Sequence, residues 1–150
     1  MPVLYYQLME HKQLARFVPR FADARILVIG DLMLDHYLVG SVERISPEAP
    51  VPVVLVQDER DMPGGAANVA GFLRAFGAAV TVCGLVGEDA AAAMLFQHFA
   101  RRGIDCGAVI RSSERPTTMK TRVVAARQQV VRIDREDTRP LGPEILAEIR

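Results

Sequence analysis

The sequence has little cysteine, no tryptophan and no excess of charge of either sign. Its 150 residues include two cysteines, and 18 basic residues balance 18 acidic ones. A net charge of zero gives no support for binding nucleic acid or an anionic membrane through bulk electrostatics. Cys83 and Cys106 form no Cys-x-x-Cys motif. Because Cys83 lies in an apolar stretch, we expect a buried, reduced thiol there.

Long apolar runs are absent as well. No stretch approaches the roughly 20 apolar residues of a membrane-spanning helix, and the first residues lack the order of basic, apolar and small segments that marks a signal peptide. His36 and His98 have no metal-ligand spacing to cysteine or to another histidine. We therefore expect a cytoplasmic protein that has neither a membrane nor a nucleic acid as its partner and that forms no metal site of its own.

What the sequence does contain is an alternation of apolar strands and helices. Residues 25–29 and 79–86 are short apolar runs, typical of parallel strands buried on both faces. Helices are predicted over residues 65–76 and 89–102, each with a glycine just after its end, and the first has Val69, Leu73 and Phe76 on one face. This order predicts an α/β fold with a parallel sheet. Residues 32–40 are predicted to be a loop or a partial helix.

The amino-terminal part differs from this alternation. Apolar side chains recur at helical spacing over residues 8–21, and Pro19 is expected to interrupt the helix. Residues 1–24 are therefore predicted to be an extension that is partly helical. The domain proper is predicted to begin at residue 25.

A smaller sheet is predicted from strand-like runs that no helix separates. Residues 119–126 and 129–134 are two such runs with two residues between them, which indicates a hairpin. Residues 51–57 are β-branched, and Pro52 places this strand at a sheet edge. We expect a small β lid with strands near residues 51–57 and 119–134. Exposed strand edges with apolar side chains invite pairing between subunits, so we expect a homodimer through the lid.

Polar residues and glycines gather where these elements end or begin. Asp31 and Asp35 follow the first strand, and the carboxyl ends of parallel strands are where open α/β sheets bind ligands. Gly64 and Gly65 precede a helix, where backbone N–H groups can meet an oxygen-rich ligand. Asn68 offers an amide one turn later. This set suits a polyol, since carboxylates accept hydrogen bonds from hydroxyls.

Two stretches in this region resemble the sugar-site motifs of the ribokinase-like (PfkB) carbohydrate kinases. They are residues 30–35 (GDLMLD) and 63–70 (PGGAANVA). Residues 44–53 (RISPEAPVPV), 117–122 (TTMKTR) and 128–134 (QQVVRID) resemble one branch of that family. That branch is the D-glycero-β-D-manno-heptose 7-phosphate kinases, which serve synthesis of the lipopolysaccharide inner-core heptose. The similarity runs from about residue 25 to the last residue.

The resemblance implies a ribokinase-like three-layer α/β/α sandwich, present here in part, with residues 25–150 as the amino-terminal half of the kinase domain. It implies transfer of the γ-phosphoryl group of ATP to the anomeric hydroxyl of a seven-carbon sugar phosphate, a reaction that depends on positioning and charge neutralisation. Asp35 stands where the family has its sugar-hydroxyl carboxylate. The glycine pair and Asn68 match the second sugar contact. Asp31 stands where other members often carry Ser or Asn.

Two cations complete the predicted substrate site. Lys120 and Arg122 alternate with uncharged side chains in a predicted strand, which puts both on one face. A cationic pair aimed at the pocket suits a substrate that already carries a phosphate.

Each of these residues also has a purely structural interpretation. The glycine pair can be a tight turn, Asp31 can cap the following segment, and Asp35 can be a solvated loop acid. Asn68 can satisfy nearby backbone groups. Lys120 and Arg122 can protect a sheet edge from pairing. The structure must decide between these interpretations and a ligand site.

The catalytic Gly-x-Gly-Asp loop of the family, whose aspartate deprotonates the acceptor hydroxyl, does not occur in this sequence. That loop and the ATP-binding elements belong to the carboxy-terminal half of the family's domain. We therefore expect no catalytic base in this chain and expect ATP and Mg²⁺ to be bound mainly by the other half. The alternatives are another sugar kinase of the same family and a non-catalytic fragment that binds a sugar phosphate or dimerises.

Overall fold

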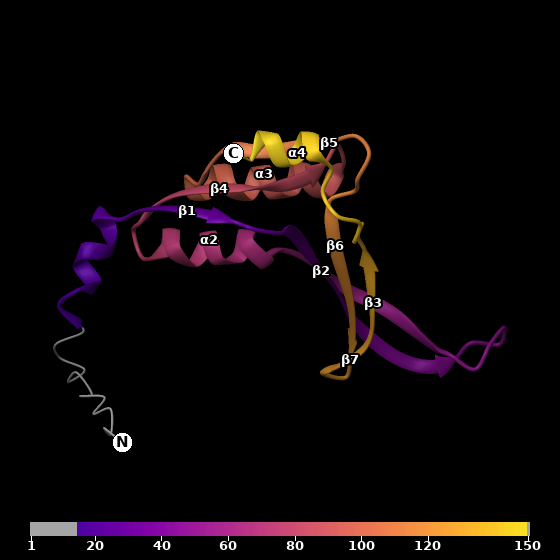
Figure 1. The fold of residues 1–150 in the computed structure, drawn as a ribbon. Helices are drawn as coiled ribbons and strands as arrows, with labels where there is room; N and C mark the ends of the chain where they lie inside the picture. The colour runs from indigo at the N-terminus through magenta and orange to yellow at the C-terminus, as the bar shows by residue number, and fades with distance from the viewer. Residues whose placement is uncertain (1–14, 150) are drawn as a thin grey trace, which may run out of the picture.

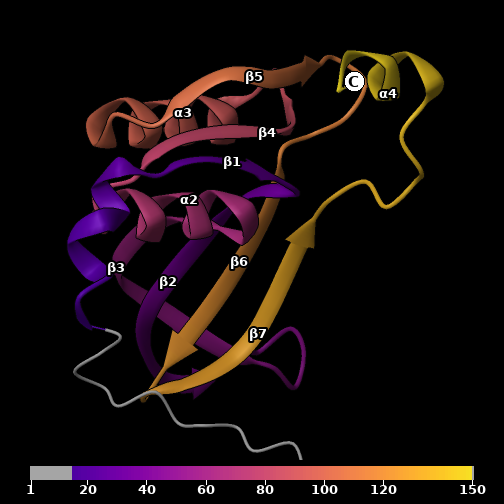
Figure 2. The ribbon, with the colours of Figure 1, turned by 60° about the vertical axis from the view of Figure 1, so that its left-hand side comes forward.

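The computed structural model describes residues 15–149, which form two sheets joined end to end (Figure 1). In chain order the elements are the 3-10 helix η1 (Val18–Asp23), β1 (Arg25–Ile29), β2 (Leu32–Ile45), β3 (Pro52–Gly64), α2 (Gly65–Ala75), β4 (Ala79–Gly87), α3 (Ala90–Arg102), β5 (Asp105–Ser112), β6 (Thr118–Ala125), β7 (Gln128–Arg135) and α4 (Pro143–Glu148). The main sheet has the order β1-β4-β5, and the lid sheet has the order β3-β2-β6-β7. Figure 2 shows the lid strands leaving the end of the main sheet at which β1 continues into β2.

The main sheet is parallel, as the alternation predicts. Helices α2 and α3 pack on it and on each other, and Leu95 and Phe99 of α3 are fully buried. The expectation that β1 is buried on both faces is wrong. Val28 packs against the core, whereas Leu27 and Ile29 are 57% and 60% exposed. The reason is that, among residues 15–149, no helix covers the outer face of β1.

Helix α2 buries small side chains rather than the large ones that the sequence pattern favours. Ala67 and Ala70 are fully buried, whereas Val69 and Phe76 are at least half exposed and Leu73 is partly buried. Alanine on the inner face lets the helix axis approach the sheet closely, and larger side chains would not fit at that distance. The predicted apolar face of this helix is therefore rotated away from the core.

Helix α3 has the predicted boundaries. The side chain of Asp89 accepts a hydrogen bond from the Ala92 N–H at 2.9 Å and caps the first turn. Gly103 ends the helix with a φ of 62°, a left-handed conformation that glycine adopts without a steric cost.

The prediction of a loop or partial helix at residues 32–40 is also wrong. These residues begin β2, which pairs antiparallel with β3 on one side and parallel with β6 on the other. Because both edges of β2 are hydrogen-bonded, pairing overrides the weak local strand preference of its Met, Asp and His residues. Strand β3 is longer than the predicted 51–57 and lies at the sheet edge, as Pro52 predicts.

The predicted hairpin at the other side of the lid is confirmed. Strands β6 and β7 pair antiparallel, and the turn residues Ala126 and Arg127 have φ values of 49° and 65°. Two successive left-handed residues match the primed turns that suit twisted hairpins. The turn lies one residue earlier than the sequence pattern indicates.

The predicted amino-terminal helix lies partly outside the described residues. Pro19 stands in the first turn of η1. Phe21 of η1 stacks edge-on against Phe76, with ring centroids 6.0 Å apart. Elsewhere Cys83 is a buried free thiol, as expected. Within residues 15–149, no helix is long and apolar enough to span a bilayer.

Candidate sugar site

The two glycine-containing motifs meet where the main sheet joins the lid. Met33 at the start of β2 lies opposite Gly64 at the end of β3. The Ala66 N–H in the first turn of α2 donates a 3.0 Å hydrogen bond to the carbonyl of Asp31. This bond fixes the start of α2 against the end of β1. It also means that the Ala66 N–H is already paired and is not open to a ligand.

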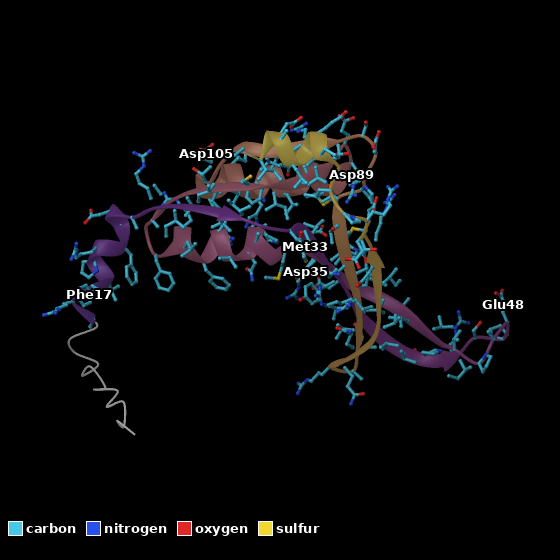
Figure 3. The ribbon with its side chains drawn as sticks, viewed as in Figure 1. Phe17, Met33, Asp35, Glu48, Asp89 and Asp105 are labelled. Atoms are coloured by element: carbon cyan, nitrogen blue, oxygen red, sulfur yellow. The ribbon has the colours of Figure 1, made fainter. Side chains whose placement is uncertain are left out.

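Close approach of the chain explains the glycine pair. Gly65 has a φ of 52°, and a Cβ there would lie 2.5 Å from the carbonyl oxygen of Asp31. A Cβ on Gly64 would lie 2.8 Å from a carboxylate oxygen of Asp35. Gly64 therefore allows the Asp35 carboxylate to lie directly against the chain at the start of α2, and Gly65 allows the same turn to lie against Asp31. Figure 3 shows Met33 and Asp35 at this junction between α2 and the lid.

Asp35 is ion-paired with Arg122. Nη1 of Arg122 donates to Oδ1 of Asp35 at 2.5 Å, and the two side chains are 21% and 19% exposed. The hydrogen bond to Asp35 raises the pKa of the Arg122 guanidinium. The same guanidinium lies over the ring of Tyr37, 5.4 Å from the centroid. Asp35 is thus a half-buried strand residue with a fixed partner and not a solvated loop acid.

Lys120 lies on the same face of β6 but is turned toward β7. Its ammonium donates to Asp134 and Glu136, each at 3.1 Å. The hydrogen bond to Asp134, followed by that to Glu136, raises the pKa of Lys120. Strand β6 is an interior strand of the lid, so the edge-protection interpretation of Lys120 and Arg122 is wrong.

A cavity of about 420 Å³ opens at the carboxyl ends of β1 and β4. Asp31, Met33 and Gly84 line it, and residues 136–141 pass over it after β7. Asp31 is exposed there, at the position where open α/β sheets bind ligands. Asn68 is exposed on α2 and lines a different groove, beside Met62. The structure therefore groups Asp35, the glycine pair and Arg122 closely, with Asp31 beside them and Asn68 in a separate groove that Met62 also lines.

A buried network that the sequence analysis missed holds the lid on the main sheet. Thr117 is 1% exposed; its N–H donates to Asp89 at 2.9 Å, and its hydroxyl accepts from the Gly87 N–H at 2.8 Å. Burial raises the pKa of Asp89, but the hydrogen bonds from Ala92 and Thr117 outweigh it and leave the pKa lowered. Residues 87 and 117 are far apart in sequence, so no local pattern indicates the network.

The chain belongs to the pfkB family of carbohydrate kinases, because the model of that family matches residues 23–149. The bifunctional protein HldE of Pelobacter propionicus is 51% identical over 137 residues, which are 91% of this chain and 28% of that protein. HldE of Helicobacter hepaticus is 53% identical over 121 residues, 81% of this chain and 25% of that protein. The chain thus spans about a quarter of the length of the curated relatives that it matches.

Solved structures identify the fold as ribokinase-like. A putative sugar kinase from Clostridium perfringens superposes with a TM-score of 0.66 at 12% identity, covering 83% of this chain and 39% of that one. The ribokinase of Arabidopsis thaliana, solved with ribose and ATP, gives a TM-score of 0.61 at 18% identity over 74% of this chain and 35% of its own. At these identities the likeness establishes the fold alone.

Proposed function

We propose that this chain carries the sugar site of an ATP-dependent kinase that phosphorylates D-glycero-β-D-manno-heptose 7-phosphate at the anomeric hydroxyl. The observation that carries the proposal is the Asp35–Arg122 pair beside the glycine pair. The salt bridge joins a carboxylate that can accept a hydrogen bond from a sugar hydroxyl to a guanidinium that can donate hydrogen bonds to a phosphate. The identity of about 50% to the HldE proteins supports the heptose assignment.

The pair leaves atoms free for a substrate. Arg122 uses Nη1 both for Asp35 and for the carbonyl of Lys120, at 3.3 Å. Its Nη2 and Nε can then meet a phosphate as a fork. Oδ1 of Asp35 accepts from Arg122, while the other oxygen, next to Gly64, can accept from a sugar hydroxyl. The charge of Lys120 is already neutralised by Asp134 and Glu136, so we do not assign it a direct contact with the substrate phosphate.

The remaining parts of the reaction are proposed to come from outside this chain. No Gly-x-Gly-Asp loop occurs in the sequence, and among residues 15–149 no three acidic, His or Cys side chains are placed to hold a metal ion. We propose that ATP and Mg²⁺ are held mainly by the other part of the kinase. ATP supplies the γ-phosphoryl group, and this chain positions the acceptor sugar.

Exposed apolar residues on the lid support a homodimer. Leu55 on β3 is 61% exposed, and Val131 and Ile133 on β7 are 46% and 57% exposed. Both strands are sheet edges, and exposed apolar edges favour pairing with another copy. We propose that the lids pair in this way and that the protein works in the cytoplasm, with its sugar phosphate and ATP.

Calorimetric titration of the 150-residue chain tests the substrate class. We expect saturable binding of heptose 7-phosphate and much weaker binding of the unphosphorylated heptose. Equal affinity for both sugars contradicts the phosphate-reading role and favours another sugar kinase of the family. Absence of any sugar binding contradicts the sugar site itself.

A further inference from the structure

A groove of about 660 Å³ lies between α2, α3 and the end of β3, apart from the cavity at Asp31. Three basic side chains line it: Arg74 of α2 and both His98 and Arg102 of α3. Its one acidic residue is Asp61, whose carboxylate already bonds the imidazole of His36 at 2.8 Å. The groove therefore carries an excess of positive charge, although the chain as a whole is neutral.

The two arginines reach across from one helix to the other. A Cβ on Gly71 of α2 would lie 2.6 Å from Nη1 of Arg102, so the missing side chain makes room for that guanidinium. In the opposite direction, a Cβ on Gly103, which ends α3, would lie 3.8 Å from the guanidinium nitrogens of Arg74. Arg102 also contacts the Nε2 atom of His98. The three basic groups thus converge on one place.

Neither arginine of the groove is neutralised by an acid among the described residues. Burial and the neighbouring Arg102 lower the pKa of His98, which favours the neutral imidazole that accepts a hydrogen bond from Arg102. In the part of the chain that the structure describes, Arg74 and Arg102 have no acidic partner within salt-bridge distance. Complementing the helix dipoles explains an arginine in the last turn of each helix. It does not explain why neither guanidinium has an acidic partner within residues 15–149 or why Arg102 contacts His98 of the preceding turn.

We propose that the groove of Arg74, His98 and Arg102 is an anion site that binds a phosphate group. Two guanidinium forks match phosphate oxygens, and the volume admits a phosphate with an attached small group. A free phosphate, a sugar phosphate and a nucleotide share this chemistry. The site does not include Asp35 or Arg122, so a failure of this proposal would not contradict the proposed kinase substrate, and the reverse also holds.

Nuclear magnetic resonance of the 150-residue chain, following the His98 imidazole, tests the site at constant ionic strength. The probes are inorganic phosphate, sedoheptulose 7-phosphate and ADP, with sodium chloride as the blank. We expect saturable shifts of His98 with phosphate, and the probe that binds at the lowest concentration identifies the source. A chloride response as large as the phosphate response overturns the proposal.

Matched arginine variants separate a site from diffuse charge. Arg102→Gln should weaken phosphate binding at least tenfold, since charge-assisted hydrogen bonds are lost. Arg101→Gln removes the same charge from the same turn but does not line the groove, and it should change binding less than twofold. Equal effects of the two variants contradict the site. If Arg102→Gln loses cooperative thermal unfolding, Arg74→Gln decides the question by the same comparison.

Discussion

Arg122 and Asp35 are 87 residues apart in the sequence and form one ion pair at 2.5 Å, on the face of the lid that meets the glycine pair. The pair exists because β6 runs parallel to β2, which places Lys120 opposite Asp35 and Arg122 opposite Tyr37. A carboxylate held in this way needs no reorganisation before it accepts a hydrogen bond from a sugar hydroxyl. We propose that the ion pair serves substrate orientation more than stability, since partly exposed pairs contribute little to folding.

The first prediction concerns Asp35. Asp35→Ala should weaken sugar binding by ten- to a hundredfold, because a hydrogen bond to a charged group is worth about 1.5–3 kcal/mol. Calorimetric titration with heptose 7-phosphate measures the change. Asp58→Ala is the control, since Asp58 is a lid acid that also pairs with an arginine, Arg60. Unchanged affinity in the Asp35 variant would reduce this residue to a structural partner of Arg122.

Much of the fold and part of the site could be predicted from the sequence. Strands β1 and β4, the Asp89 cap and the β6–β7 hairpin have local signals, namely apolar runs, a capping residue and a turn. Strand β2 does not, because its strand state depends on partners 7 to 31 residues away on β3 and 85 residues away on β6. The bond between Asp35 and Arg122 depends on the same pairing. Motifs and strand alternation therefore find the candidate residues, and only the register of the lid shows which of them touch.

A second prediction is that the 150-residue chain has no kinase activity alone. Removal of a general base typically costs about 10²–10⁴-fold in rate, and the ATP-binding elements of the family are expected outside this chain. A coupled ADP-release assay with heptose 7-phosphate and Mg-ATP checks this. Robust turnover by the purified chain would show that these 150 residues themselves carry a general base and a nucleotide site.

Thr117 should matter for stability rather than chemistry. Thr117→Val keeps the shape but leaves the Gly87 N–H without its buried acceptor, at a cost of about 1–3 kcal/mol in unfolding free energy. Urea denaturation measures this cost. Thr138→Val makes the same replacement at an exposed position and should be nearly neutral. Equal effects of the two variants would mean that the network does not hold the lid to the main sheet.

Ionisation of Asp89 should make the stability of the fold depend on pH, with a definite sign. Its pKa in the folded chain is lowered from 3.8, so its contribution to stability is present above the unfolded pKa and is lost as the pH falls through the folded pKa. The Asp89→Asn variant should therefore have a lower free energy of unfolding at pH 7 than the natural chain. Between neutral and acid pH, the free energy of unfolding should fall less in the variant than in the natural chain. Thermal unfolding at several pH values checks the difference. Parallel curves for the two proteins would exclude this role of Asp89.

The last prediction separates phosphate recognition from charge balance at Arg122. Arg122→Lys keeps the charge beside Asp35 but loses the guanidinium fork, and Arg122→Ala loses both. If the free Nη2 and Nε atoms bind the substrate phosphate, both variants should lose affinity for heptose 7-phosphate, and the alanine variant should lose more. Both variants should change the affinity for the unphosphorylated sugar much less.

Arg132→Ala is the control, because Arg132 lies directly opposite Arg122 on β7 and pairs with Asp134 instead. If lysine restores full affinity, Arg122 acts only by neutralising Asp35. If both sugars lose affinity equally, it positions the carboxylate and does not contact the phosphate. In either case the heptose phosphate assignment would rest on the relatives alone.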